Sequence, residues 1–256
     1  MIAKVLHYLY RFDVRLARPM VQQLPSTSTE IIYPDSDGQP MADNTKQFEW
    51  IVVIKENLSL LYKDDPNVFV AGDLLWYPVE GNNKIRQAPD ALVAFGRPKG
   101  HRGSYQQWKE NNIPPQVVFE VLSPGNRRSE MAKKLMFYKR YGVEEYYEYD
   151  PDRIDFVGYK RGANGLEVID FSNTWVSPAL GIRFVLKPET LEIYRPDGER
   201  FLTFVEIGEM LETVKTELEG AKTELEGAKT ELKGAKAENK KLADKLKELG
   251  IDPNSL

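Results

Sequence analysis

The sequence predicts an α/β protein of the α+β type, with a mixed central sheet flanked by helices, additional β-strands and a C-terminal coiled-coil helix. Three observations predict this fold class. Short segments rich in β-branched and aromatic residues recur between residues 67 and 194, which is typical of strands. Two stretches with helical spacing of apolar residues, 45–65 and 129–142, lie among or beside them. Three near-identical heptads, TELEGAK, TELEGAK and TELKGAK, run from Thr216 to Lys236.

Composition limits the possible function classes. Of the 256 residues, 41% are hydrophobic and 29% are charged, which is typical of a globular chain. The chain has no cysteine, which excludes disulfides, thiolate metal sites and cysteine nucleophiles and fits a reducing cytoplasm. A formal net charge of -4 indicates that any DNA-binding surface must be a local basic patch. We therefore expect a cytoplasmic protein.

Residues 1–24 are interpreted as an N-terminal extension. Charged residues interrupt its apolar stretch, and no small-residue cleavage site follows, so a signal peptide is the less favoured alternative. No segment approaches the roughly 18 consecutive apolar residues that a membrane helix needs, and we expect no membrane association. The next stretch, 25–45, is rich in Pro, Ser, Asp and Gly and is typical of a loop.

Residues 25–204 are expected to form the main domain. The helix over 45–65 should end before Pro66, and the helix over 129–142 should stop at Gly142. Strands are expected at 67–79, 88–96, 115–123, 143–150, 153–160, 166–170 and 182–186. The segment 97–115 is a polar insertion, too hydrophilic for the core and rich enough in Lys, Arg, Tyr and Trp to contact a ligand.

Residues 205–256 are expected to form a heptad-repeat coiled coil. Position a holds Leu218, Leu225, Leu232, Asn239 and Leu246, and position d holds Ala221, Ala228, Ala235, Leu242 and Leu249. Glu occupies position g and Lys position e in each repeat, so parallel strands would pair opposite charges and antiparallel strands like charges. Asn239 at position a favours two strands over three. The sequence thus predicts a homodimer through a parallel coiled coil.

Two features weaken that coiled coil. Gly220, Gly227 and Gly234 each cost about 1 kcal/mol relative to alanine in a helix. Alanine at position d also makes a thin apolar core. A solvated, partly frayed single helix therefore remains the alternative.

Glu120 lies at the centre of an apolar strand, VVFEVLSPG, residues 117–125. Side chains alternate along a strand, and both faces of this one are apolar, so we expect it to be central in the sheet. An unpaired carboxylate there would be costly and must be neutralised by a proton, a cationic side chain or a metal ion. A purely structural pair with an arginine is the alternative.

A second acid, Asp90, stands at the start of the preceding strand. Two neighbouring strands can bring such acids within reach of one divalent ion, and hard cations such as Mg²⁺, or Mn²⁺ in its place, prefer carboxylate oxygens. Asp73 on the first strand is a candidate third ligand, although a paired strand aspartate is an equal alternative. Lys133 and Lys134 lie on the helix that follows Glu120, where an ammonium group could stabilise charge developing on a phosphate.

These residues carry a resemblance to a known family. The order of "APD", "VFEVLSPG", a helical lysine followed four residues later by Tyr138, and "YGVEEYYEYDPD" resembles the PD-(D/E)XK nuclease superfamily. More closely, the chain is similar over residues 25–195 to the Uma-type family of proposed restriction endonucleases, which is abundant in cyanobacteria. The resemblance implies a restriction-endonuclease-like fold and a metal-dependent DNA endonuclease. Its catalytic residues would be Asp90, Glu120 and Lys134.

One departure from the superfamily pattern concerns the lysine. The pattern places it two residues after the acid, where this chain has Leu122. The resemblance to the Uma-type family implies that the lysine has moved to the helix, where Lys134 fits and Lys133 is the near alternative. If neither lysine pointed at Glu120, activity would be in doubt.

Other function classes remain open. A catalytically inactive DNA-binding or scaffolding protein on the same fold would suit the charge balance and the moved lysine. A glycosidase would also use two carboxylates, but it leaves the helical lysine without a role. The basic stretch that holds Arg127, Arg128, Lys133, Lys139 and Arg140 could contact phosphates or simply be a solvated helix face. His7 and His101 have no zinc-ligand spacing.

Overall fold

A computed structural model describes residues 31–38, 40–250 and 252. Its helices are α1 (Thr45–Leu61), α2 (Arg128–Tyr141), α3 (Phe204–Glu248) and the short 3₁₀ helix η1 (Gln107–Glu110). Its strands are β1 (Val68–Ala71), β2 (Trp76–Tyr77), β3 (Ala91–Phe95), β4 (Tyr105–Gln106), β5 (Val117–Val121), β6 (Glu145–Asp150), β7 (Asp155–Gly162), β8 (Gly165–Val168), β9 (Thr174–Val176), β10 (Arg183–Leu186) and β11 (Leu191–Tyr194). The predicted N-terminal extension lies outside the described residues.

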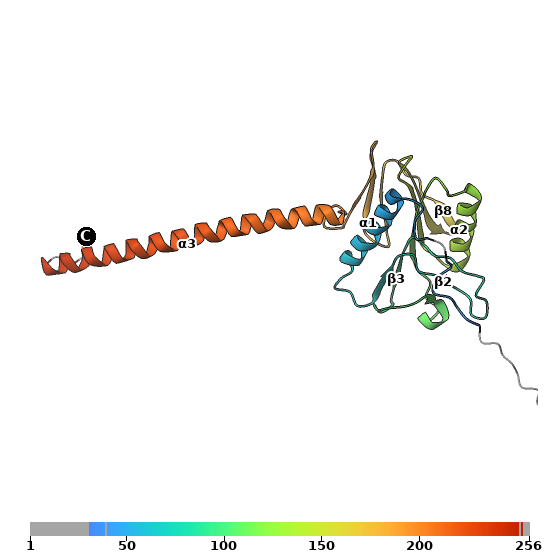
Figure 1. Cartoon of the computed structure of the whole chain (residues 1–256), viewed down its shortest axis with the longest axis horizontal. Coiled ribbons are helices and arrows are strands. Elements are labelled where there is room, and N and C mark those ends of the chain that lie inside the picture. Colours follow the sequence, from blue (N-terminus) through green and yellow to red (C-terminus); the bar gives the residue numbers. More distant parts are fainter. Residues whose placement is uncertain (1–30, 39, 251, 253–256) are drawn as a thin grey trace, which may run out of the picture. The chain divides into compact units, whose positions relative to one another are not determined.

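The predicted mixed central sheet is confirmed. Six strands pair in the order β1-β3-β5-β6-β7-β8, and β5 pairs with β6 in parallel while the other neighbours are antiparallel. The helix α1 and the three-stranded sheet β11-β10-β9 contribute to the hydrophobic core on one face. The helix α2 packs on the other face, where Tyr138 is buried (Figure 1). The strand β5 has all five residues buried, so its expected central position is confirmed.

The prediction of a single strand over 67–79 is wrong. β1 ends at Ala71, and Asp73 adopts a left-handed backbone with φ of 46°. This turn breaks the strand, and β2 then pairs with β4 in a separate two-stranded sheet. Residue-level alternation cannot show such a break, because apolar residues continue on both sides of it.

The segment 97–115 is only partly as expected. Most of it is loop, but Tyr105 is fully buried, so the insertion does contribute to the core. Glu110 accepts hydrogen bonds from Arg97 at 2.8 Å and from Arg102 at 2.6 Å. These two partly buried ion pairs hold the loop in place and neutralise the Glu110 carboxylate, which the polarity of the segment alone does not reveal.

The helix ends follow the local sequence signals. Gly142 caps α2 with φ of 96°, as its position predicted. Thr203 caps α3 by accepting from the backbone N–H of Glu206, so the helix begins one residue before the predicted boundary at 205. Among the helices that the structure describes, none has the combination of length and hydropathy that a membrane span requires.

Glu145, at the start of β6, is another buried acid, and its contacts stabilise the fold. Its carboxylate accepts hydrogen bonds from the Tyr147 hydroxyl at 2.8 Å, the Ala179 backbone N–H at 2.9 Å and the Ser177 hydroxyl. It thereby ties the central sheet to the loop between β9 and β10.

We expect Glu145→Ala to lower the free energy of unfolding by about 2–4 kcal/mol, because buried donors lose their acceptor. Urea denaturation followed by circular dichroism measures this loss. Glu144→Ala is the matched control, since Glu144 is exposed, and a shift below about 0.5 kcal/mol is expected there. Equal stability of the two variants would contradict the anchoring role.

Candidate active site

Asp90 and Glu120 lie side by side on the face of the sheet that α2 covers. β3 and β5 are antiparallel neighbours in which Ala91 pairs with Phe119, so the same register places Asp90 opposite Glu120. The Asp90 carboxylate accepts a hydrogen bond of 2.6 Å from the backbone N–H of Val121. Both acids are buried, with exposed fractions of 9% for Asp90 and 2% for Glu120. The sheet thus brings the two predicted carboxylates together.

The helix α2 supplies a cation and a hydroxyl to Glu120. The ammonium group of Lys134 lies 2.8 Å from Glu120 Oε2, and the Tyr138 hydroxyl donates to Oε1 of the same carboxylate. Residues four apart lie on one face of a helix, which is why both reach the same acid. Lys133 is exposed and forms no ion pair with a described residue. The lysine that contacts Glu120 is therefore Lys134.

The electrostatics of this cluster favour a bound cation. Burial, together with the charge of Glu120, raises the pKa of Asp90 well above its ordinary value. Burial alone would lower the pKa of Lys134, but Glu120 and Asp90 raise it to about 12. One ammonium group thus faces two buried acids, and the second acid is left without a full counter-charge.

We expect Asp90→Asn to stabilise the metal-free protein. Because the folded protein holds the Asp90 proton to a higher pH than the unfolded chain, its stability falls as pH rises above the ordinary aspartate pKa of about 4. Asparagine removes this dependence and can still accept from Val121. Urea denaturation in EDTA should show the variant to be more stable than the wild type at pH 7–8, with the difference shrinking towards pH 4. A less stable variant at pH 7–8 would contradict the raised pKa.

Asp73 lies near enough to the two acids for their charges to act on one another: burial, then Asp37 and Glu120, raise the pKa of Asp73, and Asp73 contributes to the raised pKa of Asp90. It lies exposed in the turn after β1, where its backbone N–H donates to the carbonyls of Pro89 and Asp90 at 3.1 and 3.3 Å. Within the described part of the chain, no three His, Cys, Asp or Glu side chains gather closely enough to hold a metal ion. The role of Asp73 as a third ligand stays a prediction.

Two residues near the site were not chosen from the sequence. Glu148 on β6 pairs in register with Glu120, accepts a 2.6 Å hydrogen bond from the Tyr146 hydroxyl, and has a pKa raised by burial and by Glu120. The alternation of VEEYYEYD places it on the same face as Tyr146, a signal that could have identified it. Gln47 on α1 donates to the Val121 carbonyl at 2.8 Å, which only the packing of α1 against β5 reveals.

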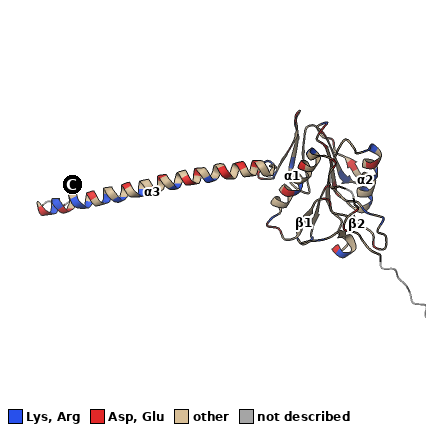
Figure 2. Cartoon of the chain, viewed as in Figure 1, with Lys and Arg blue, Asp and Glu red and all other residues tan. Residues whose placement is uncertain are grey.

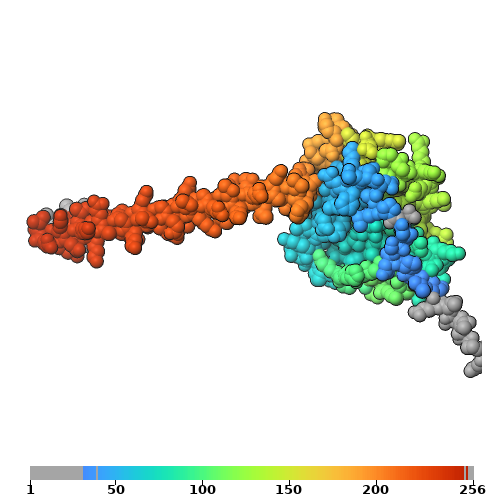
Figure 3. All heavy atoms as spheres, viewed as in Figure 1, coloured from blue at the N-terminus to red at the C-terminus, as the bar shows by residue number. Residues whose placement is uncertain are grey.

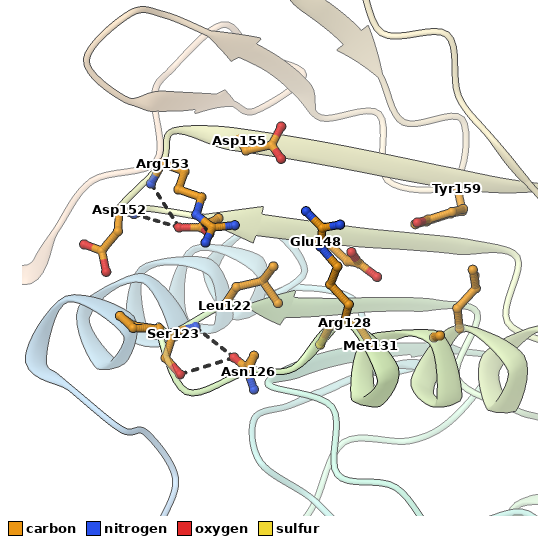
Figure 4. A pocket seen from close by; sticks show the side chains of 14 residues that line it. Leu122, Ser123, Asn126, Arg128, Met131, Glu148, Asp152, Arg153, Asp155 and Tyr159 are labelled. Carbon is orange, nitrogen blue, oxygen red and sulfur yellow. Dashed lines mark hydrogen bonds and ion pairs between the residues drawn. The ribbon is translucent and has the colours of Figure 1, made fainter.

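A groove of about 450 Å³ opens beside this cluster, between the end of β5, the start of α2 and the strands β6 and β7 (Figure 4). Its charged lining residues are Arg128, Glu148, Asp150, Asp152, Arg153 and Asp155. Arg153 lies 3.7 Å from Asp150, whereas Arg128 makes no ion pair with a described residue. Figure 4 shows Arg128 extending from α2 beside Glu148. The groove is thus mainly acidic, with one arginine free to meet a phosphate.

A comparison with models of known protein families finds a match. The family model described as "Uma2: Putative restriction endonuclease" matches residues 23–221, which is most of the chain. The chain belongs to this family. The Uma2 match includes Asp90 just before β3, Glu120 in β5 and the helix that carries Lys134. It also runs past the predicted domain end at 204 into the first part of α3.

A solved structure is also similar to this Uma2 protein. It is a crystal structure of "a putative nuclease belonging to DUF820" from Anabaena variabilis, with a TM-score of 0.43 and 16% sequence identity, covering 56% of this chain and 77% of the other. A comparison with curated proteins finds no match.

The donor set of the cluster fits a hard divalent cation. Asp90 and Glu120 offer only oxygen atoms, and Mg²⁺ is commonly held by one or two carboxylates together with waters and substrate phosphates. Each carboxylate oxygen can accept more than one interaction, so the contacts of Glu120 with Lys134 and Tyr138 leave acceptor capacity. Burial, followed by the charge of Glu120, raises the pKa of Asp90, so its ionised form is disfavoured in the metal-free protein, and a bound cation would stabilise that form.

Proposed function

We propose that this Uma2 protein is a metal-dependent DNA endonuclease that hydrolyses phosphodiester bonds at Asp90, Glu120 and Lys134. The observation that carries the proposal is the convergence of two buried carboxylates and one ammonium group at a single point on the sheet. Each of the three comes from a different element, β5, α2 or the residue before β3, so the chain is folded to bring them together. Family membership supports the same reaction class.

Each residue has a specific task in this proposal. Asp90 and Glu120 would hold Mg²⁺, or Mn²⁺ in its place, and the ion when bound would lower the pKa of a water molecule and polarise the scissile phosphate. Lys134 holds Glu120 in position and presents a positive charge that offsets the charge developing on the phosphate. Burial alone would lower its pKa, but Glu120 and Asp90 raise it to about 12, so the ammonium group is protonated at neutral pH in the metal-free protein.

Arg128 is the proposed phosphate contact next to the site. It is exposed at the start of α2 and lines the groove. The other basic residues of this stretch, Arg127, Lys133, Lys139 and Arg140, are also exposed and available to a DNA backbone. DNA is therefore proposed to approach along α2, from Arg127 and Arg128 at its start to Lys139 and Arg140 in its last turn, since acidic residues predominate in the rest of the groove.

Calorimetric titration with Mg²⁺ and Mn²⁺ tests the metal site directly. We expect the wild type to bind one of these ions and Asp90→Ala to bind it at least about tenfold more weakly, because a two-carboxylate site loses half of its charged ligands. Asp73→Ala is run in parallel and shows whether Asp73 is a ligand. Equal binding by the wild type and Asp90→Ala would contradict the proposed site.

A second candidate function is a DNA-binding or scaffolding protein that keeps the fold without cleavage. The observation that favours it is that both oxygens of Glu120 already accept hydrogen bonds, from Lys134 and Tyr138. Plasmid cleavage in the presence of Mg²⁺ distinguishes the two. Binding of DNA with no cleavage by the wild type would select this alternative. Pairing of two chains through α3 would present two sites to one DNA molecule in either case.

A further inference from the structure

The apolar stripe of α3 begins well before the three repeats. Counting back by sevens from Leu218, positions a and d are held by Phe204, Ile207, Leu211 and Val214. Their exposed fractions are 85%, 40%, 67% and 56%. The heptad pattern therefore covers the whole of α3, and its most apolar part lies in the first two heptads.

Nothing within the described chain covers this stripe. None of the 45 residues of α3 is buried, and Leu218, Leu225 and Leu232 each remain more than half exposed. The side chains of α3 stand out along its length in the space-filling view (Figure 3). Helices in proteins are stabilised chiefly by packing an apolar face, so a partner that covered this stripe would stabilise α3.

An apolar groove joins the start of this stripe to the main domain. It has a volume of about 530 Å³, and its apolar lining residues are Val52, Val53, Leu60, Leu202, Phe204 and Ile207. The first three belong to α1, and the last two belong to positions a and d of α3. Because Phe204 and Ile207 belong to both, the stripe and the groove form one continuous apolar surface.

We infer that a second copy of this chain covers that surface in parallel, with α3 paired along its full length and the second copy's first turns of α3 seated at the groove. Charge complementarity identifies the occupant. Position g holds Glu217, Glu224, Glu231 and Glu238, and position e holds Lys215, Lys222, Lys229 and Lys236. Parallel copies set Glu against Lys at every central g–e pair, whereas antiparallel copies set like charges together. Figure 2 shows both charge types along α3.

The position of the groove at the start of α3 also favours a parallel pair of helices. In a parallel pair each residue at position a or d meets its own counterpart, so Phe204 meets Phe204 between two grooves. In an antiparallel pair Phe204 would instead face the last turns near Leu249. The three glycines lie at position c, outside this interface, and a side chain there would contact nothing within 4 Å. They weaken the helix without disturbing the pairing surface. The inference is independent of the nuclease chemistry, so an inactive chain should pair equally well.

The absence of cysteine from the chain allows a direct test of direction. Full-length Leu211→Cys is oxidised with copper–phenanthroline and run on a non-reducing gel. We expect more than half of the chain to become a disulfide-linked dimer, because in the parallel pair the two position-a thiols meet. Glu209→Cys at position f faces away and should remain below one tenth. The parallel pair would be overturned if the two variants cross-linked equally, or if neither variant cross-linked.

The role of the groove is tested with two matched residues of α1. Leu60 and Phe48 are both exposed apolar residues, at 41% and 48%, but only Leu60 lines the groove. Sedimentation equilibrium of the full chain should give twice the 29.4 kDa of one chain at micromolar concentration. We expect Leu60→Glu to raise the dimer dissociation constant at least tenfold and Phe48→Glu to change it less than twofold.

Two outcomes would overturn the inference. A single-chain mass up to 100 µM would show that a second copy does not cover α3, and the surface would then belong to a different partner. Equal dissociation constants for Leu60→Glu and Phe48→Glu would remove the groove from the interface. Circular dichroism of each variant verifies that helix content is retained before the masses are compared.

Discussion

Replacing Glu120 by glutamine is expected to reduce Mg²⁺-dependent plasmid cleavage by about 1,000-fold or more, which corresponds to about 4 kcal/mol of activation free energy. Glu120 is the acid that Lys134 and Tyr138 of α2 both contact, and it lies opposite Asp90 in the register of β5 with β3. The amide removes one of two anionic metal ligands. It also sets an N–H₂ group against the donor of either Lys134 or Tyr138, because these two bind different oxygens of Glu120, and the resulting repulsion displaces the remaining oxygen.

The control for this variant is Glu148→Gln. Glu148 lies in register with Glu120 on the neighbouring strand and on the same face, but it contacts Tyr146 instead of Lys134. We expect Glu148→Gln to retain cleavage within about tenfold of the wild type, since it removes charge near the site without removing a proposed ligand. Cleavage is measured as the rate of loss of supercoiled plasmid, with urea denaturation to show that both variants are folded. Substantial cleavage by Glu120→Gln would remove Glu120 from the catalytic residues.

The sequence predicts the layout of the site because local rules dominate there. The alternation in VVFEVLSPG assigns Glu120 to one face of a buried strand, and the four-residue spacing of Lys134 and Tyr138 assigns them to one face of a helix. Burial then requires that the carboxylate be neutralised by a proton, a cationic side chain or a metal ion. The observed 2.8 Å contact between Lys134 and Glu120 is the outcome of these three constraints.

The features of the site that the sequence did not predict depend on contacts between segments that are distant in the sequence. The register that places Asp90 opposite Glu120 is set by the pairing of β3 with β5 and has no local sequence signal. The break after β1 follows from the left-handed backbone of Asp73, which is uncommon for a residue other than glycine. Asp73 therefore lies in an exposed turn, although the alternation of apolar residues assigns it to a strand. The contact of Gln47 with Val121 likewise depends on how α1 packs.

The Lys134→Ala variant is expected to lose both stability and cleavage. Lys134 and Glu120 form a buried pair with side-chain exposures of 14% and 1%, and removing one partner of such a pair leaves an uncompensated charge in the core. The expected cost is about 3 kcal/mol of unfolding free energy. Cleavage should fall about 100-fold or more, because the phosphate loses a fixed positive charge. Lys133→Ala is the matched control, since Lys133 is exposed, and it should change stability by less than about 0.5 kcal/mol.

Added Mg²⁺ separates the two roles of Lys134. An ion that binds the folded state and not the unfolded state raises stability, and the ammonium group of Lys134 opposes a cation at the neighbouring acids. Mg²⁺ should therefore stabilise Lys134→Ala more than it stabilises the wild type, and thereby replace the lost counter-charge of Glu120. It should not restore cleavage, because the ion cannot also supply the charge that Lys134 presents to the phosphate. Recovery of both properties would reduce Lys134 to a structural counter-ion, and a larger cleavage defect in Lys133→Ala would transfer the catalytic role to Lys133.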